Sequence, residues 1–190
     1  GRVYAEELWK DRELNTLQWV GVLFLLLRYR FGVVRLERVM DRIIREGKGK
    51  PEEVVKERCL RLARERVIPA IFTEARAAVS HHMSQGDHVA ILSASSEYMI
   101  RPVAEALGIG PVLATPVHVD KGLFTGGYDA PICYGEGKVA WAERFCEEHG
   151  LDLAQATFYT DSFTDLPVME RVQSHISVNP DPRLERISRE

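Results

Sequence analysis

The chain contains 190 residues, of which 45% are hydrophobic, so it is long enough to bury one substantial core, or a core with a small accessory domain. Its 25 basic and 28 acidic residues are spread along the sequence and give a formal charge of −3, which excludes the basic face typical of nucleic-acid-binding proteins. The three cysteines, Cys59, Cys133 and Cys146, lack C-x-x-C spacing, which argues against a disulfide framework or a zinc cluster and favours the reducing cytoplasm.

The first part of the chain, residues 1–67, shows helical patterns and no strand pattern. Its first residues are charged, and they lack the basic region, apolar region and small-residue cleavage site that follow one another in a signal peptide. The run LQWVGVLFLLL is apolar on nearly all sides but shorter than the about 20 residues that a membrane-spanning helix needs, so we expect a packed helix. Contact of Trp19–Leu27 with lipid is the alternative. Pro51 can begin a further helix. Because residues 1–67 show helical patterns and no strand pattern, we predict that they form a small all-α domain.

From residue 68 onward, helical and strand patterns alternate to the end of the chain. HVAILS is a short, continuously apolar run of the kind that forms a strand buried on both faces, and PVLATPVHV, ATFYTD and SHISVNP are three further predicted strands. The glycine-rich KGLFTGGYDA, between the second and third strands, predicts a hairpin or flap. This alternation predicts an α/β fold over residues 68–190, with a parallel sheet covered by helices on both faces.

Ligands of open parallel sheets bind at the carboxyl ends of the strands, so the polar residues after each apolar run are the site candidates. Asp161 ends the run ATFYT, and Asp165 lies in the first turn of the following helix, so both carboxylates can reach one crevice. Two carboxylates suit Mg²⁺, which takes oxygen ligands and keeps several waters. The alternative is that Asp161 is a turn residue and Asp165 a charge stabilised by the helix dipole.

Ser93 and Lys138 are candidates for binding an anion. Ser93 closes HVAIL and precedes Ala94 and Ser95, whose small side chains let the backbone approach a ligand at the start of a helix. A helix N-cap is the alternative role for such a serine. Lys138 lies near the start of a predicted helix, where the helix dipole disfavours a cation. It can neutralise phosphoryl oxygens or orient a carboxylate, or else pair in solvent with Glu136.

Other catalytic motifs are absent from the sequence. It contains no G-x-G-x-x-G, no G-x-x-x-x-G-K-[ST], no G-x-S-x-G and no H-x-x-x-H. Dinucleotide binding, P-loop chemistry, a serine nucleophile on a strand-helix elbow and a histidine metal site therefore have no support in the sequence.

Taken in order, the candidate motifs resemble the haloacid dehalogenase (HAD) superfamily, and within it the phosphoserine phosphatase-like branch, subfamily IB, with a helical cap before the second motif. The resemblance rests on ILSASSEYMIRPVAEALGI, CYGEGKVAWAERF and YTDSFTDLPVMERV, which follow one another in family order. It implies a HAD-like Rossmannoid parallel sheet at 68–190 and a cap domain at 1–67. It also implies a Mg²⁺-dependent phosphatase that acts on a small-molecule phosphate monoester.

In that family, phosphoryl transfer goes to an aspartate of a D-x-D-x-T motif on the first strand, and water then hydrolyses the aspartyl-phosphate. By this resemblance Ser93, with Ala94 and Ser95, would bind the phosphoryl group. Lys138 would stabilise that group and the nucleophile, while Asp161 and Asp165 would hold Mg²⁺. The predicted catalytic residues are therefore Ser93, Lys138, Asp161 and Asp165.

The D-x-D motif itself is missing from the 190 residues. We therefore expect the chain as given to have little or no activity, and we favour the interpretation that it is part of a longer phosphatase. A non-catalytic pseudoenzyme that binds phosphate or another ligand is the alternative. No pattern in the sequence assigns an oligomeric state.

The missing motif also leads to a structural expectation. In the family's sheet the motif strand lies between the strands that we assign to HVAILS and ATFYTD. Without it, buried backbone donors and acceptors on both neighbours lose their partners, at about 1–3 kcal/mol each. This is large beside a net domain stability of about 5–15 kcal/mol. We therefore expect that the usual sheet does not persist unless these two neighbours pair with each other.

Overall fold

The computed structural model describes residues 36–187, and the predicted apolar helix around Trp19–Leu27 lies outside them. In chain order, the helices and helical turns are α3 (Leu36–Glu46), α4 (Glu52–Leu62), η1 (Ala63–Val67), η2 (Ile68–Ala70), α5 (Thr73–Ser84), α6 (Glu97–Leu107), α7 (Glu136–His149), η3 (Leu153–Gln155), η4 (Phe163–Asp165), α8 (Leu166–Met169) and α9 (Pro182–Ile187). The strands are β1 (Ile91–Leu92), β2 (Val112–Leu113), β3 (Val117–Asp120), β4 (Leu123–Tyr128), β5 (Thr157–Thr160) and β6 (Ser174–Ser177).

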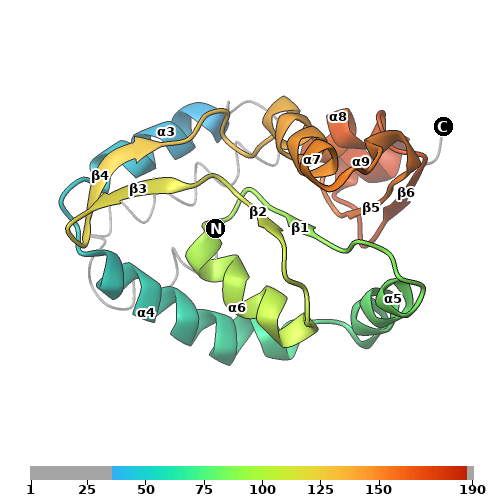
Figure 1. The fold of residues 1–190 in the computed structure, drawn as a ribbon, viewed down its shortest axis with the longest axis horizontal. Helices are drawn as coiled ribbons and strands as arrows, with labels where there is room; N and C mark the ends of the chain where they lie inside the picture. Colours follow the sequence, from blue (N-terminus) through green and yellow to red (C-terminus); the bar gives the residue numbers. More distant parts are fainter. Residues whose placement is uncertain (1–35, 188–190) are drawn as a thin grey trace.

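The hairpin β3–β4 lies beside α3 at one end of the molecule (Figure 1). The link between α3 and α4 is hydrogen-bonded to this hairpin, because the Gly49 amide donates to the carbonyl of Phe124 and the Phe124 amide donates to the carbonyl of Lys50. The Tyr128 hydroxyl donates to Asp41 of α3 over 2.9 Å. The hairpin and the first two described helices therefore form one packed unit.

The run PVLATPVHV, which was predicted as one strand, forms two. Its first part is β2, parallel to β1, whereas its second part is β3, antiparallel to β4. Pro116 separates them, because proline has no amide hydrogen to donate to a strand ladder. The chain then turns back at Lys121 and Gly122, whose φ angles are 48° and 76°, and this confirms the hairpin predicted for KGLFTGGYDA.

Residues 91–113 and 157–177 each form a β-α-β unit, and these units confirm the predicted α/β class. One unit is β1, α6 and β2, and the second is β5, α8 and β6; each has a parallel strand pair. Helix α6 ends at Gly108, whose φ of 74° gives the left-handed C-cap that glycine accommodates best. The side chains that are buried completely and largest in volume are those of Leu62, Leu184, Val168, Cys59 and Cys133.

The strands within residues 36–187 form three separate two-stranded sheets, so the prediction of one continuous parallel sheet is wrong for this part of the chain. There, β1 pairs only with β2, and β5 pairs only with β6. The strands formed by HVAILS and ATFYTD, β1 and β5, thus do not pair with each other. Tyr159 and Ile176 are register partners in β5 and β6 and remain 41% and 40% exposed, so the face of this strand pair on which they lie is only partly covered.

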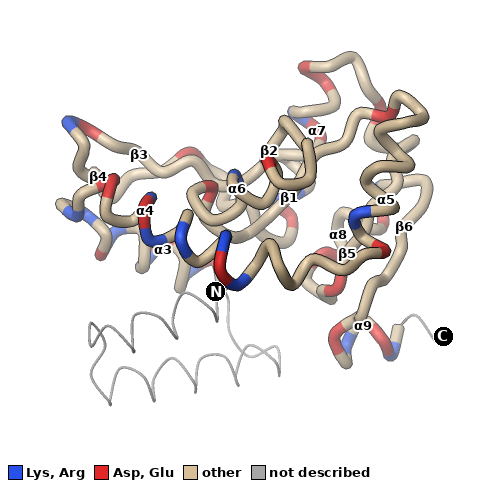
Figure 2. Tube along the Cα trace, turned by 90° about the horizontal axis from the view of Figure 1, so that it is seen from below, with Lys and Arg blue, Asp and Glu red and all other residues tan. Residues whose placement is uncertain are grey.

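Charged residues of both signs are interspersed along the described chain (Figure 2). On α3, Arg42 pairs with Glu46 over 2.7 Å and Arg45 pairs with Asp41 over 2.9 Å. In residues 36–187 no helix has the length and apolar character needed to cross a membrane.

Candidate active site

A buried ion pair lies at the centre of the candidate site. Lys138 Nζ, from the first turn of α7, lies 2.7 Å from Asp165 Oδ1, at the end of η4. The two side chains are only 9% and 6% exposed. The solvent-exposed pairing of Lys138 with Glu136, which the sequence left open, is wrong, because Glu136 instead pairs with Arg171 over 3.3 Å.

Glycine at position 137 allows Lys138 to reach this place. A Cβ atom on Gly137 would lie 1.9 Å from the carbonyl oxygen of Ile132, well inside van der Waals contact. The start of α7 can therefore pack closely against the preceding loop only because the position has no side chain. The sequence GEGK thus sets both the start of the helix and the direction of its lysine.

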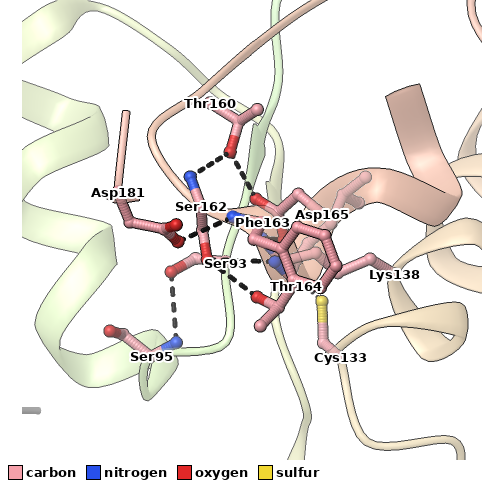
Figure 3. Close-up of polar contacts among 11 residues, drawn as sticks. Ser93, Ser95, Cys133, Lys138, Thr160, Ser162, Phe163, Thr164, Asp165 and Asp181 are labelled. Atoms are coloured by element: carbon pink, nitrogen blue, oxygen red, sulfur yellow. Dashed lines mark hydrogen bonds and ion pairs between the residues drawn. The ribbon is translucent and has the colours of Figure 1, made fainter. Parts of the chain in front are cut away.

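Thr160 hydrogen-bonds the second oxygen of the Asp165 carboxylate. Its hydroxyl donates to Asp165 Oδ2 over 2.7 Å and accepts a hydrogen bond from the Ser162 amide over 3.1 Å (Figure 3). Asp165 precedes α8 but makes no side-chain cap bond to it, so helix capping does not explain this carboxylate. A buried ion pair contributes little net stability compared with apolar residues of the same volume, which favours a chemical role for the pair.

Asp161 differs from Asp165 in its surroundings. It directly follows β5 and is exposed, and its carboxylate has no hydrogen-bond or ion-pair partner among the residues that the structure describes. Its main-chain carbonyl, in contrast, accepts a 2.7 Å hydrogen bond from the Asp181 amide. The backbone at Asp161 is therefore held in place while the carboxylate stays available to a ligand.

The donor set at Asp161 and Asp165 fits Mg²⁺. It consists of carboxylate oxygens, and Mg²⁺ binds through one or two carboxylates while it keeps several waters. Within residues 36–187, no three His, Cys, Asp or Glu side chains gather into a group that could hold a metal ion. The two carboxylates are thus of the oxygen type that Mg²⁺ accepts, and among the described residues no third ligand of these types accompanies them.

Ser93 lies at the carboxyl end of β1, where its amide donates to the carbonyl of Leu113 over 2.9 Å. The Ser93 hydroxyl accepts a 3.1 Å hydrogen bond from the Ser95 amide, which curls the backbone through Ala94 just before α6 begins. Ser96 precedes the helix without a side-chain cap, so the first amides of α6 are open to an anion. A turn of this kind can bind a small anion through main-chain amides at the helix start.

Cys133 links these groups, although the sequence patterns did not single it out. Its buried thiol lies 3.5 Å from the carbonyl of Leu113, and its amide donates to Thr115 Oγ1 over 2.8 Å. Burial raises the pKa of the Cys133 thiol from 9.0 to about 11, and this is partly opposed by the charge of Lys138 and a backbone hydrogen bond from Ser93. Ser93 and Lys138 therefore both lie near this buried thiol (Figure 3).

Thr160 and Asp181 are the other contributors that the sequence analysis missed. Thr160 could have been found as the hydroxyl residue that ends a strand directly before Asp161. Asp181 could have been found from the sequence Asp-Pro before a helix, which is typical of an N-cap followed by proline at the first helical position.

The chain was compared with known proteins. The model of the haloacid dehalogenase-like hydrolase family matches residues 2–170. A protein of Mycobacterium tuberculosis named as a probable phosphatase is 38% identical over 120 residues, which are 63% of this chain and 42% of the relative. A histidinol-phosphatase of Neisseria meningitidis serogroup C is 32% identical over 130 residues, which are 66% of this chain and 59% of the relative. The chain thus spans about half the length of these relatives.

Solved structures agree with the fold. A Bordetella pertussis protein of unknown function superposes with a TM-score of 0.84 at 25% identity, over 98% of this chain and 86% of that one. A phosphoserine phosphatase solved as a phospho-aspartyl intermediate analogue superposes with a TM-score of 0.64 at 19% identity, over 88% of this chain and 77% of that one. Among the relatives by sequence, a phosphoserine phosphatase of Mycobacterium tuberculosis is 31% identical over 109 residues, which are 57% of this chain and 35% of the relative.

Proposed function

Because the chain belongs to the haloacid dehalogenase-like hydrolase family, we propose that the protein formed with these residues hydrolyses small-molecule phosphate monoesters with the help of Mg²⁺. The observation that carries the proposal is the buried ion pair of Lys138 and Asp165, together with the exposed carboxylate of Asp161, which has no partner among residues 36–187. The phosphatase names of its relatives in Mycobacterium tuberculosis and Neisseria meningitidis support it.

Each predicted residue has a role in this proposal. The Ser93 hydroxyl, the Ala94 amide and the Ser95 side chain would hydrogen-bond the phosphoryl oxygens at the start of α6, while the Ser95 amide holds the Ser93 hydroxyl. Lys138 lies between Asp165 and the anion site, where its charge offsets that of the phosphoryl group as transfer proceeds.

Asp161 and Asp165 are the residues that would hold Mg²⁺ in this proposal. Mg²⁺, when bound, would neutralise charge on the phosphoryl oxygens. Asp161 would be a direct ligand, because its carboxylate is exposed and has no partner among residues 36–187. Asp165 would hold Mg²⁺ through the lone pairs that remain free on its two oxygens, because Lys138 already bonds Oδ1 and Thr160 already bonds Oδ2.

We further propose that the nucleophilic aspartate comes from outside the 190 residues and that the chain alone does not turn over substrate. Two observations support this part of the proposal. No D-x-D motif occurs in the sequence. In the described residues, β1 and β5 each have a strand partner on one side only, and a parallel strand entering between them would end beside Ser93 and Asp161.

The proposal also includes a division into a helical cap at 1–67 and a core at 68–190. Contacts between α4 and α6 support a cap that lies close to the site. The Tyr98 hydroxyl, in the first turn of α6, donates to Glu52 of α4 over 2.7 Å, and its ring meets that of Phe124 edge-on at 5.9 Å. A substrate bound at the start of α6 would thus lie next to cap side chains, which would select it.

The test uses the protein expressed from its complete gene, with phosphate release measured on a panel of phosphate monoesters. We expect release with Mg²⁺, none with excess EDTA, and a loss of at least about a hundredfold in Asp161→Asn, because even changes beyond the direct ligands weaken metal sites about 10–100-fold. Asp120→Asn, a carboxylate exposed on the hairpin, should retain wild-type rates. Wild-type activity in Asp161→Asn would refute the assigned metal role. Binding of a phosphate analogue without turnover would instead favour the pseudoenzyme.

A further inference from the structure

We infer that Asp181 is a positioning residue that fixes the backbone of the 161–163 loop and thereby the carboxylate of Asp161. The inference rests on the proposed function, because Asp161 is there the direct ligand of Mg²⁺. Neither the sequence patterns nor the family comparison assigns a role to Asp181.

The first observation is that Asp181 caps α9. Its Oδ1 accepts hydrogen bonds from the amides of Arg183 and Leu184 over 2.9 Å and 3.0 Å. These are the second and third residues of the helix, and Pro182 occupies the first position, so the arrangement is that of an ordinary N-cap. One carboxylate oxygen is sufficient for this role.

The second carboxylate oxygen makes a bond that capping does not require. Asp181 Oδ2 accepts a 2.8 Å hydrogen bond from the amide of Phe163, eighteen positions earlier in the chain. The main-chain amide of Asp181 also donates to the carbonyl of Asp161 over 2.7 Å. The two hydrogen bonds hold the loop on both sides of Ser162, directly after the residue proposed to bind metal.

A ring contact strengthens the same junction. The guanidinium carbon of Arg183 lies 4.0 Å from the ring centroid of Phe163, which is within the range of a cation–π interaction. The Val178 amide also donates to the carbonyl of Thr160 over 2.8 Å, just before the loop begins. The loop therefore lies against the 178–184 segment along its whole length, and Asp181 supplies two of the hydrogen bonds.

Asp181→Asn separates the two roles of this side chain. Asparagine is as good an N-cap as aspartate, and its single carbonyl oxygen satisfies both helix amides when it occupies the place of Oδ1. Its NH₂ group then faces the Phe163 amide, donor against donor, so only the bond to the loop is lost. The opposite rotamer would lose two helix bonds to keep one, and is therefore disfavoured.

The experiment measures Mg²⁺ affinity by isothermal titration calorimetry on the protein from its complete gene, together with hydrogen exchange at the Phe163 and Leu184 amides. In Asp181→Asn we expect Mg²⁺ to bind about tenfold more weakly, as for other residues that orient metal ligands. Exchange should become faster at Phe163 and stay slow at Leu184. The matched control is Asp152→Asn, another capping aspartate, which accepts from the Ala154 amide over 2.9 Å at η3. It should leave Mg²⁺ affinity unchanged.

The possible outcomes are distinct. Mg²⁺ affinity within twofold of wild type in Asp181→Asn, with Phe163 exchange accelerated, would overturn the inference and leave the proposed function standing. A loss of Mg²⁺ affinity accompanied by faster exchange at Leu184 would also overturn it, because the effect would then come from a disrupted helix. A wild-type protein that binds no Mg²⁺ would overturn both the metal role of Asp161 and this inference.

Discussion

Replacing Lys138 with methionine should destabilise the chain strongly. The substitution leaves the Asp165 carboxylate buried, 6% exposed, and within residues 36–187 its side chain keeps only the Thr160 hydroxyl as a partner. Removal of one member of a buried ion pair costs about 3–5 kcal/mol, because the remaining charge is uncompensated. The hydrogen bond from Thr160 contributes about 1 kcal/mol and cannot offset this loss. We therefore expect the free energy of unfolding of Lys138→Met to fall by about 3–5 kcal/mol.

The assay is urea denaturation of the 190-residue chain followed by circular dichroism, as a double-mutant cycle with Asp165→Leu. The double variant should unfold within about 1 kcal/mol of wild type, because it removes both charges and leaves only the Thr160 hydroxyl without its acceptor. Lys56→Met is the control, since Lys56 lies 3.4 Å from Glu53 in an exposed pair whose contribution should be below about 1 kcal/mol. The reasoning would be refuted if Lys138→Met lowered the free energy of unfolding by less than about 1 kcal/mol. It would also be refuted if the double variant lost as much free energy of unfolding as the two single variants together.

Three further predictions concern the groups around the ion pair. Thr160→Val removes the hydroxyl bonded to Asp165 and should lower the free energy of unfolding by about 1–3 kcal/mol in urea denaturation. Thr157→Val, at an exposed position, should change this free energy little. Equal effects of the two substitutions would contradict the role of the hydroxyl. Gly137→Ala should lower the melting temperature sharply, because its Cβ would lie 1.9 Å from a carbonyl oxygen, whereas Gly110→Ala, with nothing within 4 Å, should not. As the pH rises from 9 to about 11, the free energy of unfolding should fall, because burial raises the pKa of Cys59 and of Cys133 from 9.0 to about 11 and the unfolded thiols lose their protons first. A Cys59→Ala/Cys133→Ala variant should show a smaller fall, and an unchanged slope would show that other groups cause it.

Local sequence signals predicted most of the described helices and strands. Pro51 marked the start of α4, and the glycine-rich KGLFTGGYDA marked the hairpin β3–β4. These signals act over a few residues through fixed φ angles and the helix dipole, so they can be read without the tertiary structure. The pairing of strands cannot be read in this way, because it depends on which edges meet in space, and the predicted continuous sheet proved to be separate pairs.

The candidate site shows the same division between local and long-range information. The position of Lys138 at the start of a helix was visible in the sequence, because a cation is disfavoured there by the dipole. Its partner Asp165 lies 27 positions later, and no local pattern reports that distance in space. Thr160 and Asp181 were missed for a related reason, since hydroxyl and carboxylate residues at strand ends and helix starts have ordinary structural roles in most proteins.

The central claim is that these residues form a phosphatase site whose nucleophile lies outside the 190 residues. The most direct test compares the 190-residue chain with the protein from the complete gene, at equal concentration and with Mg²⁺, in one phosphate-release assay. The account predicts Mg²⁺-dependent release by the complete protein and none above background by the 190-residue chain. Equal release by both would contradict it, because the nucleophile would then lie within the 190 residues.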